Sequence, residues 1–445
     1  MRKTVSVIAS LLCTCNLAGF AQDPSLQSTP LMHESKMESS SISLLDYLKM
    51  ASMQNYELQA AYHKWQGSVS KISFSNTLPN PKVTYAHFIK EVETRVGPQK
   101  EKLGVMQKIP WLGKLFAKKN IASQESEIAK QQLVITQVEL WKKLKHLLQE
   151  YYFLHKRADI QKDNILLMKF LEGVAQTRVR AGGAAADALQ AQMEISHLEN
   201  ELETIFERVK SLRARINAVL NQDYKMNLDI PYDLFPEEDL SHIQDLSLEE
   251  LKKNSPEAQL LSLVVDKSEA EKKLAQHERF PDISIGVDWV KTDRSVMNPV
   301  DNGKDPVVAM ISIDIPLWQS DYQEKVNMRS HQISASKDRY EQRLLMIQAD
   351  LQDILLKYED ADRRMQLFRD SLIPQAEQTL SVVQEAYEGG RVDLERFLDI
   401  QKKLLNFHLG FERAKVDRGQ RIADYEALTG VLLGVKELGN EITFK

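Results

Sequence analysis

The richest cluster of titratable side chains follows the glycine pair in the stretch YEGGRVDLERFLDIQ. Both signs of charge occur there within nine residues: Arg391, Asp393, Glu395, Arg396 and Asp399. Carboxylates brought close together repel one another, attract cations, and respond to pH and to divalent ions. The plain alternative is that these charges only solvate an exposed turn between helices.

The other reactive side chains show no catalytic or metal-binding arrangement. Of the ten histidines, His146 and His155 are nine residues apart and face different sides of one predicted helix, and His63, His197 and His408 are isolated. The sequence has no Ser-His-Asp order, no phosphate loop and no paired catalytic carboxylates. We therefore expect no enzyme, no cofactor and no metal site.

The N-terminus predicts a secretory signal peptide over residues 1–21. Arg2 and Lys3 precede the apolar run VSVIASLLCTC, and small residues lead up to Ala21, where we place the cut. Cleavage there removes both cysteines, Cys13 and Cys15, so the mature chain has neither a disulfide nor a thiolate. The alternative is a lipoprotein acylated at Cys15, although the residue before it is neither Gly nor Ala.

Charge and hydropathy restrict the compartment and the partners. Loss of the signal peptide moves the formal net charge from −5 to −7, which gives no electrostatic reason to bind nucleic acid. No later window holds 18 consecutive apolar residues, so the sequence predicts no transmembrane helix. Any crossing of a bilayer must then use strands.

The chain is predicted to be an internal duplication. Gly182-Gly183 and Gly389-Gly390 are 207 positions apart, and Pro110 and Pro316 are 206 apart. A heptad seam in the second half has counterparts 207 positions earlier: Tyr340, Leu344, Ile347, Leu351, Ile354, Tyr358, Ala361, Met365, Phe368 and Leu372 match Leu133, Gln137, Leu140, Leu144, Leu147, Tyr151, Leu154, Ala158, Gln161 and Ile165. Such a repeat predicts coiled-coil packing.

Each glycine pair is predicted to turn a hairpin between two antiparallel helices, at 181–184 and at 388–391. The long helix before each turn would reach about 110 Å at a rise of about 1.5 Å per residue, and Pro374 should kink the second one. The expected organisation is a flexible segment, a first repeat beginning with a helix over 43–77, an irregular linker, a second repeat beginning with a helix over 247–278, and a tail. Their bounds are 22–42, 43–221, 222–246, 247–430 and 431–445.

Four alternating segments predict strands of bilayer-crossing length, at 82–91, 102–110, 281–291 and 307–316. Trp111 and Trp318 follow Pro110 and Pro316, where an interfacial aromatic girdle belongs. A small soluble β-layer is the alternative, but no amphipathic segment is left to cover its apolar face. Four strands cannot close a barrel, and open sheet edges are costly in hydrocarbon. Other copies of the chain must therefore complete the barrel. Two copies would give eight strands with an interior filled by side chains, and three would give twelve strands with a lumen.

Over nearly the whole mature chain, the sequence resembles the TolC family of outer-membrane efflux ducts. The resemblance rests on the repeat, YEGGRVDLERFLDIQ, its partner RAGGAAADALQAQ, LPNP and the strand-ending prolines; MQKIPWLGK is similar to the heavy-metal subgroup of the CzcC and CusC kind. It implies a mainly α protein with a membrane β-barrel, formed as a homotrimer with twelve strands above a periplasmic helical tunnel. It also implies contacts with outer-membrane lipid, a periplasmic adaptor and an inner-membrane pump of the RND or ABC type.

The resemblance further implies a gate at the periplasmic hairpin tips. Asp399 matches one gate aspartate of the family, while the other is replaced by Arg396, so Glu395 or Asp393 would contribute instead. Arg391 and, in the first half, Asp187 with Gln190 occupy the comparable turns. We also consider pairing of Arg178 or Arg180 with the 388–399 cluster.

The predicted function is the exit duct of a tripartite efflux system in the outer membrane, conducting metal ions or small toxic molecules. A periplasmic coiled-coil structural protein without a barrel is the alternative. A passive porin is disfavoured, since porins do not need some 300 residues of helix. The sequence leaves open the cargo, the pump, the gate mechanism and the lipidation of Cys15.

Overall fold

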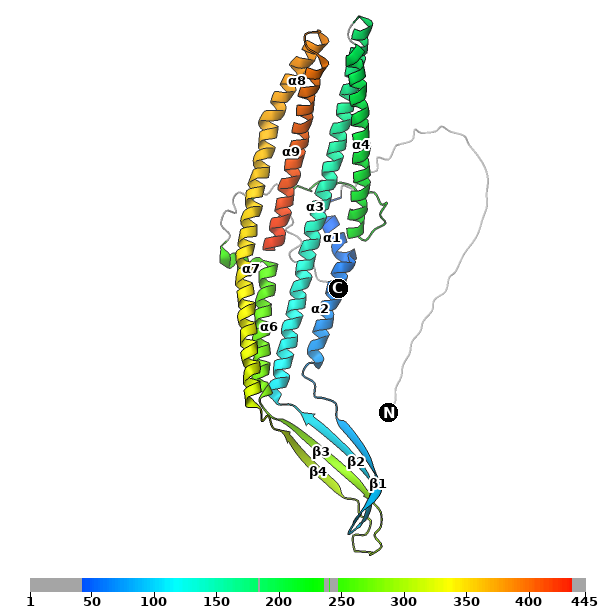
Figure 1. Cartoon of the computed structure of the whole chain (residues 1–445), viewed down its shortest axis with the longest axis vertical. Coiled ribbons are helices and arrows are strands. Elements are labelled where there is room, and N and C mark those ends of the chain that lie inside the picture. The colour runs from blue at the N-terminus through cyan, green and yellow to red at the C-terminus, as the bar shows by residue number, and fades with distance from the viewer. Residues whose placement is uncertain (1–41, 183–184, 236–239, 241–246, 434–445) are drawn as a thin grey trace, which may run out of the picture. The chain divides into compact units, whose positions relative to one another are not determined.

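The computed structural model describes residues 42–182, 185–235, 240 and 247–433 (Figure 1). Several predictions lie outside these residues: the signal peptide with Cys13 and Cys15, nearly all of 22–42, the second turn glycine Gly183, part of the 222–246 linker, and most of the 431–445 tail. In the described part of the chain, no helix is both long enough and apolar enough to span a membrane.

The two short helices predicted over 43–77 and 247–278 are each two helices, so the predictions of unbroken helices are wrong. The first consists of α1 (Leu44–Gln54) and α2 (Tyr56–Phe74), separated by Asn55, whose side chain accepts hydrogen bonds from the first turn of α2. The second consists of α5 (Leu248–Asn254) and α6 (Pro256–Glu278), separated by Ser255. Asparagine is a strong helix N-cap, and proline is favoured at the first helical position but not beyond it.

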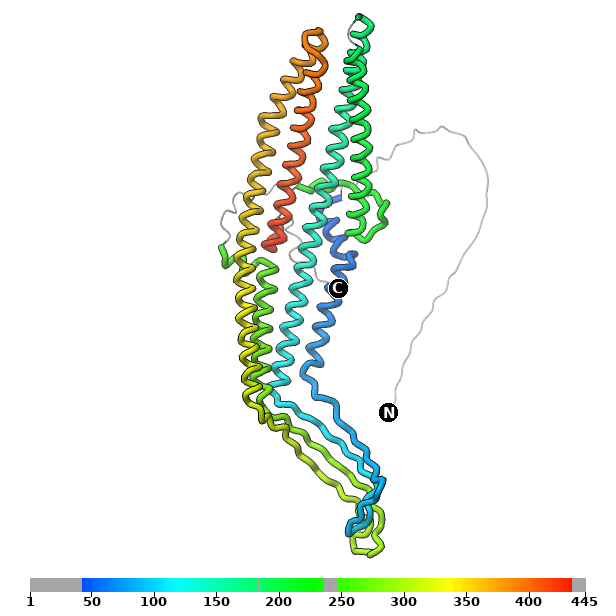
Figure 2. Tube along the Cα trace, in the orientation of Figure 1, coloured from blue at the N-terminus to red at the C-terminus, as the bar shows by residue number. Residues whose placement is uncertain are grey.

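The first long helix is α3 (Leu112–Arg180), 69 residues without a break. It starts beside the sheet and continues to a hairpin with α4 (Ala185–Val219), as the trace in Figure 2 shows. At about 1.5 Å per residue it is about 100 Å long. Every position of the predicted seam between Leu133 and Ile165 is buried except Leu147, and the next residue, Leu148, is buried in its place. The buried side of this helix therefore follows the heptad spacing of a coiled coil.

The second long helix is interrupted where Pro374 predicts it. α7 (Gln319–Leu367) passes into a π-helical turn, η2 (Phe368–Leu372), and then into α8 (Ile373–Glu388). Proline lacks an N–H and clashes with the preceding turn, and a π turn accommodates both defects. The predicted seam is buried from Leu344 to Ala361 and becomes only half-buried beyond that.

The last helix, α9 (Leu394–Thr429), runs back along α8 and also contacts α3 and α7. Gly410 of α9 faces η2: a Cβ added there would lie 2.6 Å from the Phe368 ring. Only glycine lets α9 approach the π turn this closely.

Four antiparallel strands form one sheet in the order β1-β2-β3-β4 (Figure 1). They are β1 (Lys82–Thr94), β2 (Gly97–Ile109), β3 (Asp282–Thr292) and β4 (Val307–Asp314). The first hairpin is longer than predicted, because the strands continue to a tight turn before Gly97, whose φ of 131° suits glycine. β4 ends before the predicted residue 316, since Pro316 cannot donate to a ladder.

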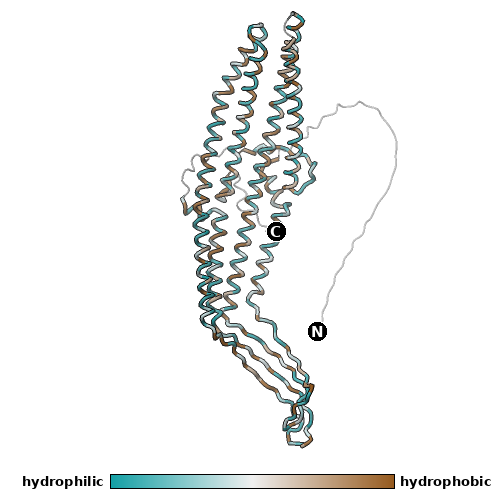
Figure 3. Tube along the Cα trace, viewed as in Figure 1, coloured by the Kyte–Doolittle hydropathy of each residue, from teal (hydrophilic) through white to brown (hydrophobic). Residues whose placement is uncertain are grey.

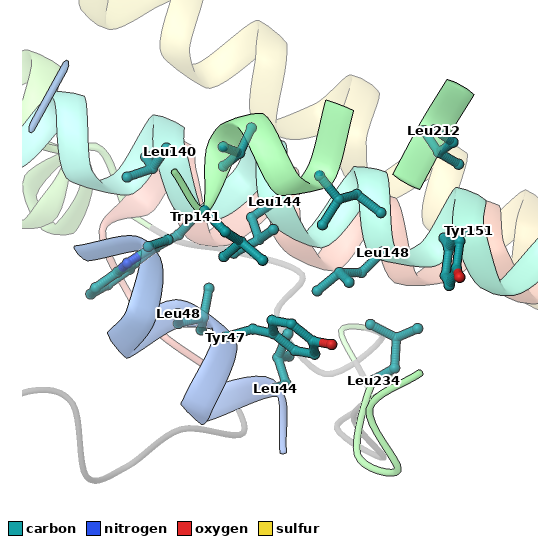
Figure 4. Packing of buried hydrophobic residues seen from close by; sticks show 14 of the residues in the cluster. Leu44, Tyr47, Leu48, Leu140, Trp141, Leu144, Leu148, Tyr151, Leu212 and Leu234 are labelled. Atoms are coloured by element: carbon teal, nitrogen blue, oxygen red, sulfur yellow. The ribbon is translucent and has the colours of Figure 1, made fainter. Parts of the chain in front are cut away.

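The largest apolar cluster joins α1 to the middle of α3 and to the linker after α4 (Figure 4). Trp141 of α3 lies against α1, and its indole N–H donates to Ser52 Oγ at 2.9 Å. Leu234 reaches the same cluster from the linker, and the hydroxyl of Tyr47 donates to the backbone carbonyl of Asp229 at 3.0 Å. The described part of the linker is therefore packed on the helices rather than loosely attached.

Candidate functional site

The first functional feature is a sheet whose two faces differ in chemistry. Residues directly opposite one another on paired strands point to the same face, and the register places eleven large apolar side chains on one of them. These are Val83, Tyr85, Leu103, Val105, Ile283, Ile285, Val287, Trp289, Val307, Ile311 and Ile313. Each is between 38% and 74% exposed. A single chain therefore leaves this face bare, which a water-soluble sheet of this size would not do.

The apolar band has defined ends. Towards the strand-connecting loops the paired apolar residues end at Tyr85 and Trp289, and the next paired residues on the same face are polar, although Ile89 of β1 lies beyond them and is 95% exposed. His87 pairs in register with Glu101, and Lys291 Nζ lies 3.6 Å from Glu101 Oε2. Between Ile283 and Trp289 the band extends about 20 Å along the strand, at about 3.4 Å per residue. Figure 3 shows polar and apolar positions interleaved along the described chain, in the strands as well as in the helices.

The other end of the band meets the start of the helices. Trp111 stacks on Phe280 with ring centroids 5.0 Å apart, and its backbone N–H donates to Asp282 at 3.0 Å. Trp318 directly precedes α7 and is 65% exposed. Pro110 directly follows β2, and Pro316 lies just beyond β4. The four residues predicted for an interface thus lie where the sheet passes into the helices.

The opposite face of the sheet carries paired charges. Lys108 Nζ lies 2.7 Å from Asp314 and 3.2 Å from Asp282, and Lys102 forms an ion pair with Asp288. Asp288 is only 5% exposed, because it lies over Gly104, where a Cβ would come within 2.2 Å of its carboxylate. The sequence does carry a signal for these pairs: Lys and Asp occupy the same face of neighbouring strands.

The sheet is open at both edges in the described part of the chain. β1 pairs only with β2, and β4 pairs only with β3. An outer strand presents a row of unpaired backbone N–H and C=O groups that can pair with another chain.

The second functional feature is the pair of helical turns at the end of the helices remote from the sheet (Figure 1). Gly182 and Gly390 adopt φ values of 94° and 71°, which glycine favours, whereas Gly389 has an ordinary φ of −76°. Asp393 begins α9 as its N-cap: the Arg396 backbone N–H donates to its carboxylate at 3.0 Å. Asp393 therefore has a structural role that the charge pattern did not indicate.

The remaining charged residues of the predicted gate are mostly solvated. Asp399 is exposed and accepts a hydrogen bond from Lys403 at 2.9 Å, one turn along α9. Arg391, Glu395 and Arg396 are exposed, and Asp187 is half-buried in the first turn of α4. Among the described residues, no cluster of three or more His, Cys, Asp or Glu could hold a metal ion.

The two hairpins meet through an arginine and a tyrosine. The Arg178 guanidinium lies 4.7 Å from the centre of the Tyr387 ring and donates to the Tyr387 backbone carbonyl at 3.3 Å. Burial, and then the nearby charge of Asp187, raise the pKa of the Tyr387 phenol. In the described residues Arg178 thus contacts the Tyr387 ring and backbone rather than a carboxylate of the 388–399 cluster.

Further polar contacts join the hairpins about three to five turns from the tip, at 3.6 residues per turn. Lys402 lies 3.2 Å from Glu194, and Gln401 Nε2 donates to Asn164 Oδ1. Sequence reasoning missed these four residues, since each is an ordinary polar residue on a long helix and only the packing brings them together.

Comparison with solved structures identifies the fold, although no family model matches the sequence and no curated protein matches it either. The outer-membrane channel OprN is similar over 87% of this chain and 89% of its own, at 17% identity and a TM-score of 0.74. CusC, described for its transmembrane channel formation, is similar over 87% and 92%, at 14% identity and 0.73. The open outer-membrane channel MtrE of Neisseria gonorrhoeae is similar over 87% and 88%, at 14% identity and 0.72.

The protomer therefore has the mainly helical fold, with a small sheet, of these outer-membrane channels. The proteins that share it are channels and not enzymes. The likeness to CusC is no greater than that to OprN, so the heavy-metal subgroup remains a prediction.

Proposed function

We propose that this protein is the outer-membrane exit duct of a tripartite efflux system. One observation carries the proposal: an open four-stranded sheet whose apolar face is bare in a single chain, while its other face holds Lys–Asp pairs. Lipid is the solvent that such an apolar face requires, and a band of about 20 Å approaches the height of about 25 Å typical of membrane barrels.

The open edges support assembly from three copies. Unpaired backbone groups are too costly in hydrocarbon to leave at a membrane edge, so β1 of one copy pairs with β4 of the next. Two copies would give eight strands, whose interior is filled by side chains, whereas three give twelve strands and a lumen. The ion-paired face, which includes Lys102, Asp288 and Lys108, then lines the lumen. The internal duplication would supply two similar hairpins per copy, six in all.

In this proposal the hairpin tips form the gate. Asp399, Glu395 and Arg396 would stand around the threefold axis, with Arg391 and Asp187 at the adjoining turns. Carboxylates repeated around an axis attract cations and open the tip by mutual repulsion when they are fully charged.

The partners follow from the location. A signal peptide exports the chain, the barrel contacts outer-membrane lipid, and the helices descend into the periplasm. There the tips would meet a periplasmic adaptor and an inner-membrane pump of the RND or ABC type. The cargo would be metal ions or small toxic molecules, and the pump would select it, because a conduit binds what it carries only weakly.

The proposal is tested on the full chain, expressed with its own export signal. We expect a detergent-extracted trimer from the outer membrane, heat-modifiable migration and conductance in planar bilayers. A stable monomer released from the periplasm without detergent would refute the duct and favour a periplasmic coiled-coil structural protein.

The gate is tested by Asp399→Asn, with Asp353→Asn as the matched control. Both aspartates are exposed and paired with a lysine one turn ahead: Asp399 with Lys403 at 2.9 Å, and Asp353 with Lys357 at 2.7 Å. We expect the first change alone to alter single-channel conductance and cation preference. Equal behaviour of the two variants would remove Asp399 from the gate.

A further inference from the structure

A cavity of about 290 Å³ separates the two hairpins at the level where α3, α8 and α9 meet. Four leucines line it, Leu167 of α3, Leu380 of α8, and Leu404 and Leu405 of α9, together with one isoleucine and four polar or charged residues. The volume lies just below the usual range for small-molecule pockets, which begins at about 300 Å³. It would hold a compact molecule of about ten heavy atoms.

One polar group in the wall of this cavity lacks a partner. Gln401 is 5% exposed, and its amide N–H donates to Asn164, but its carbonyl oxygen Oε1 has no hydrogen-bond partner among the described residues. A buried acceptor without a donor is costly, and native structures rarely keep one without a reason. The missing partner is a donor, because Oε1 can only accept.

The entrance adds negative charge. Asp163 lines the cavity from the exposed side of α3, and none of the ion pairs found among the described residues involves it. His408 also lines the cavity, and its Nε2 lies 3.7 Å from Oε1 of Glu377, which is not itself a lining residue. An N–H donor that carries a positive charge fits this combination better than a neutral hydroxyl.

We propose that this cavity binds a small amphipathic amine. The apolar body would lie among the leucines, the ammonium group would donate to Gln401 Oε1, and Asp163 would provide the opposing charge. Gln401 lies two residues beyond Asp399 on α9, so a bound amine would contact the helix that carries the proposed gate. Binding itself does not depend on conduction by the protein, and the two can fail separately.

The probe is 2-phenylethylamine, whose nine heavy atoms suit the volume, observed by saturation-transfer NMR on the purified full chain in amphipol. A ligand of this size is expected to bind with a millimolar Kd. Leu404→Trp fills the cavity and should abolish the saturable signal. Leu189→Trp, at a 61% exposed position of α4, adds the same side chain outside the cavity and should leave it unchanged.

A second variant keeps the test decisive if Leu404→Trp does not fold, as judged by circular dichroism. Gln401→Leu removes the acceptor and should weaken the amine about tenfold, while 2-phenylethanol, which lacks the charge, should bind the unaltered protein more weakly than the amine. Equal amine binding by the unaltered protein, Leu404→Trp and Gln401→Leu would overturn the proposal. The absence of saturable binding at an amine concentration 20-fold above the expected millimolar Kd would also overturn it. That result is expected if a side chain of another copy fills the cavity.

Discussion

Substituting lysine at two neighbouring positions of β4 tests which face of the sheet contacts lipid. Ile311 lies on the apolar face, opposite Ile285, and is 74% exposed in the single chain. Ser312 lies on the other face, opposite Ser284, one pair from the charged cluster of Lys108. The two positions therefore share a strand and a depth but not a face.

The expected magnitudes differ clearly. A lysine that faces lipid near the middle of a bilayer costs about 2–4 kcal/mol, so Ile311→Lys would cost about 6–12 kcal/mol in a trimer whose strands unfold together. Ser312→Lys faces a polar interior and should stay within about 0.5 kcal/mol per chain, as ordinary exposed substitutions do. Since 1.4 kcal/mol is a factor of ten in an equilibrium constant, the two variants should differ by several orders of magnitude.

The assay is urea unfolding of the protein in lipid vesicles, followed by the loss of heat-modifiable migration, together with the yield in outer membranes. Ile311→Lys should shift the midpoint strongly to lower urea and reduce the yield, and Ser312→Lys should do neither. Equal midpoints would mean that neither face contacts lipid. The reverse order would mean that the faces are assigned the wrong way round.

Three further perturbations test the helical part, each by thermal or pH-dependent unfolding in detergent. Lys145→Met leaves Glu426 buried without its partner and should cost about 3–5 kcal/mol, most of it recovered by adding Glu426→Gln; an unchanged melting curve would contradict the buried pair. Burial alone would raise the pKa of Glu125, but hydrogen bonds from lysines of α2 and α6 outweigh it and hold that pKa below its usual range. Its contribution is therefore complete above about pH 4.3 and lost as pH falls through the lowered value, so Glu125→Gln should flatten the acid side of the stability profile. Gly410→Ala meets the aromatic ring of η2 and should destabilise by about 1–3 kcal/mol, whereas Gly173→Ala, which meets nothing within 4 Å, should stabilise by up to about 1 kcal/mol.

The sequence was most informative where one periodic pattern fixes one buried or exposed face. Alternation within 281–291 and 307–316 predicted one apolar face for each strand, and the register places Ile283, Ile285, Ile311 and Ile313 together on one face of the sheet. The heptad spacing similarly predicted the burial of α3 and α7, because a long helix can bury only one stripe. Periodicity predicts these faces because equivalent positions along a helix or a strand lie in the same environment, either buried or exposed.

The contacts between hairpins were not predictable in the same way. One hypothesis paired Arg178 or Arg180 with a carboxylate of the 388–399 cluster. In the single chain Arg178 lies on the Tyr387 ring, because the hairpins are packed closely enough there to bury that ring completely. Gln401 and Asn164 are 237 residues apart and carry no pattern that links them. Such pairs depend on how two helices are set against each other, which local sequence does not specify.

The two long helical runs also differ in continuity. α3 is unbroken, whereas α7 and α8 are separated by the π turn before Pro374. On the side of that turn towards the sheet, α9 is fixed to α3 by the buried pair of Lys145 and Glu426. On the side towards the tip, the cavity between the hairpins begins at His408, two residues from Gly410, where α9 touches the π turn. Backbone continuity and packing between the hairpins therefore both change near this level, whereas closer to the tip the two hairpins pack against each other again around Tyr387 and Phe397.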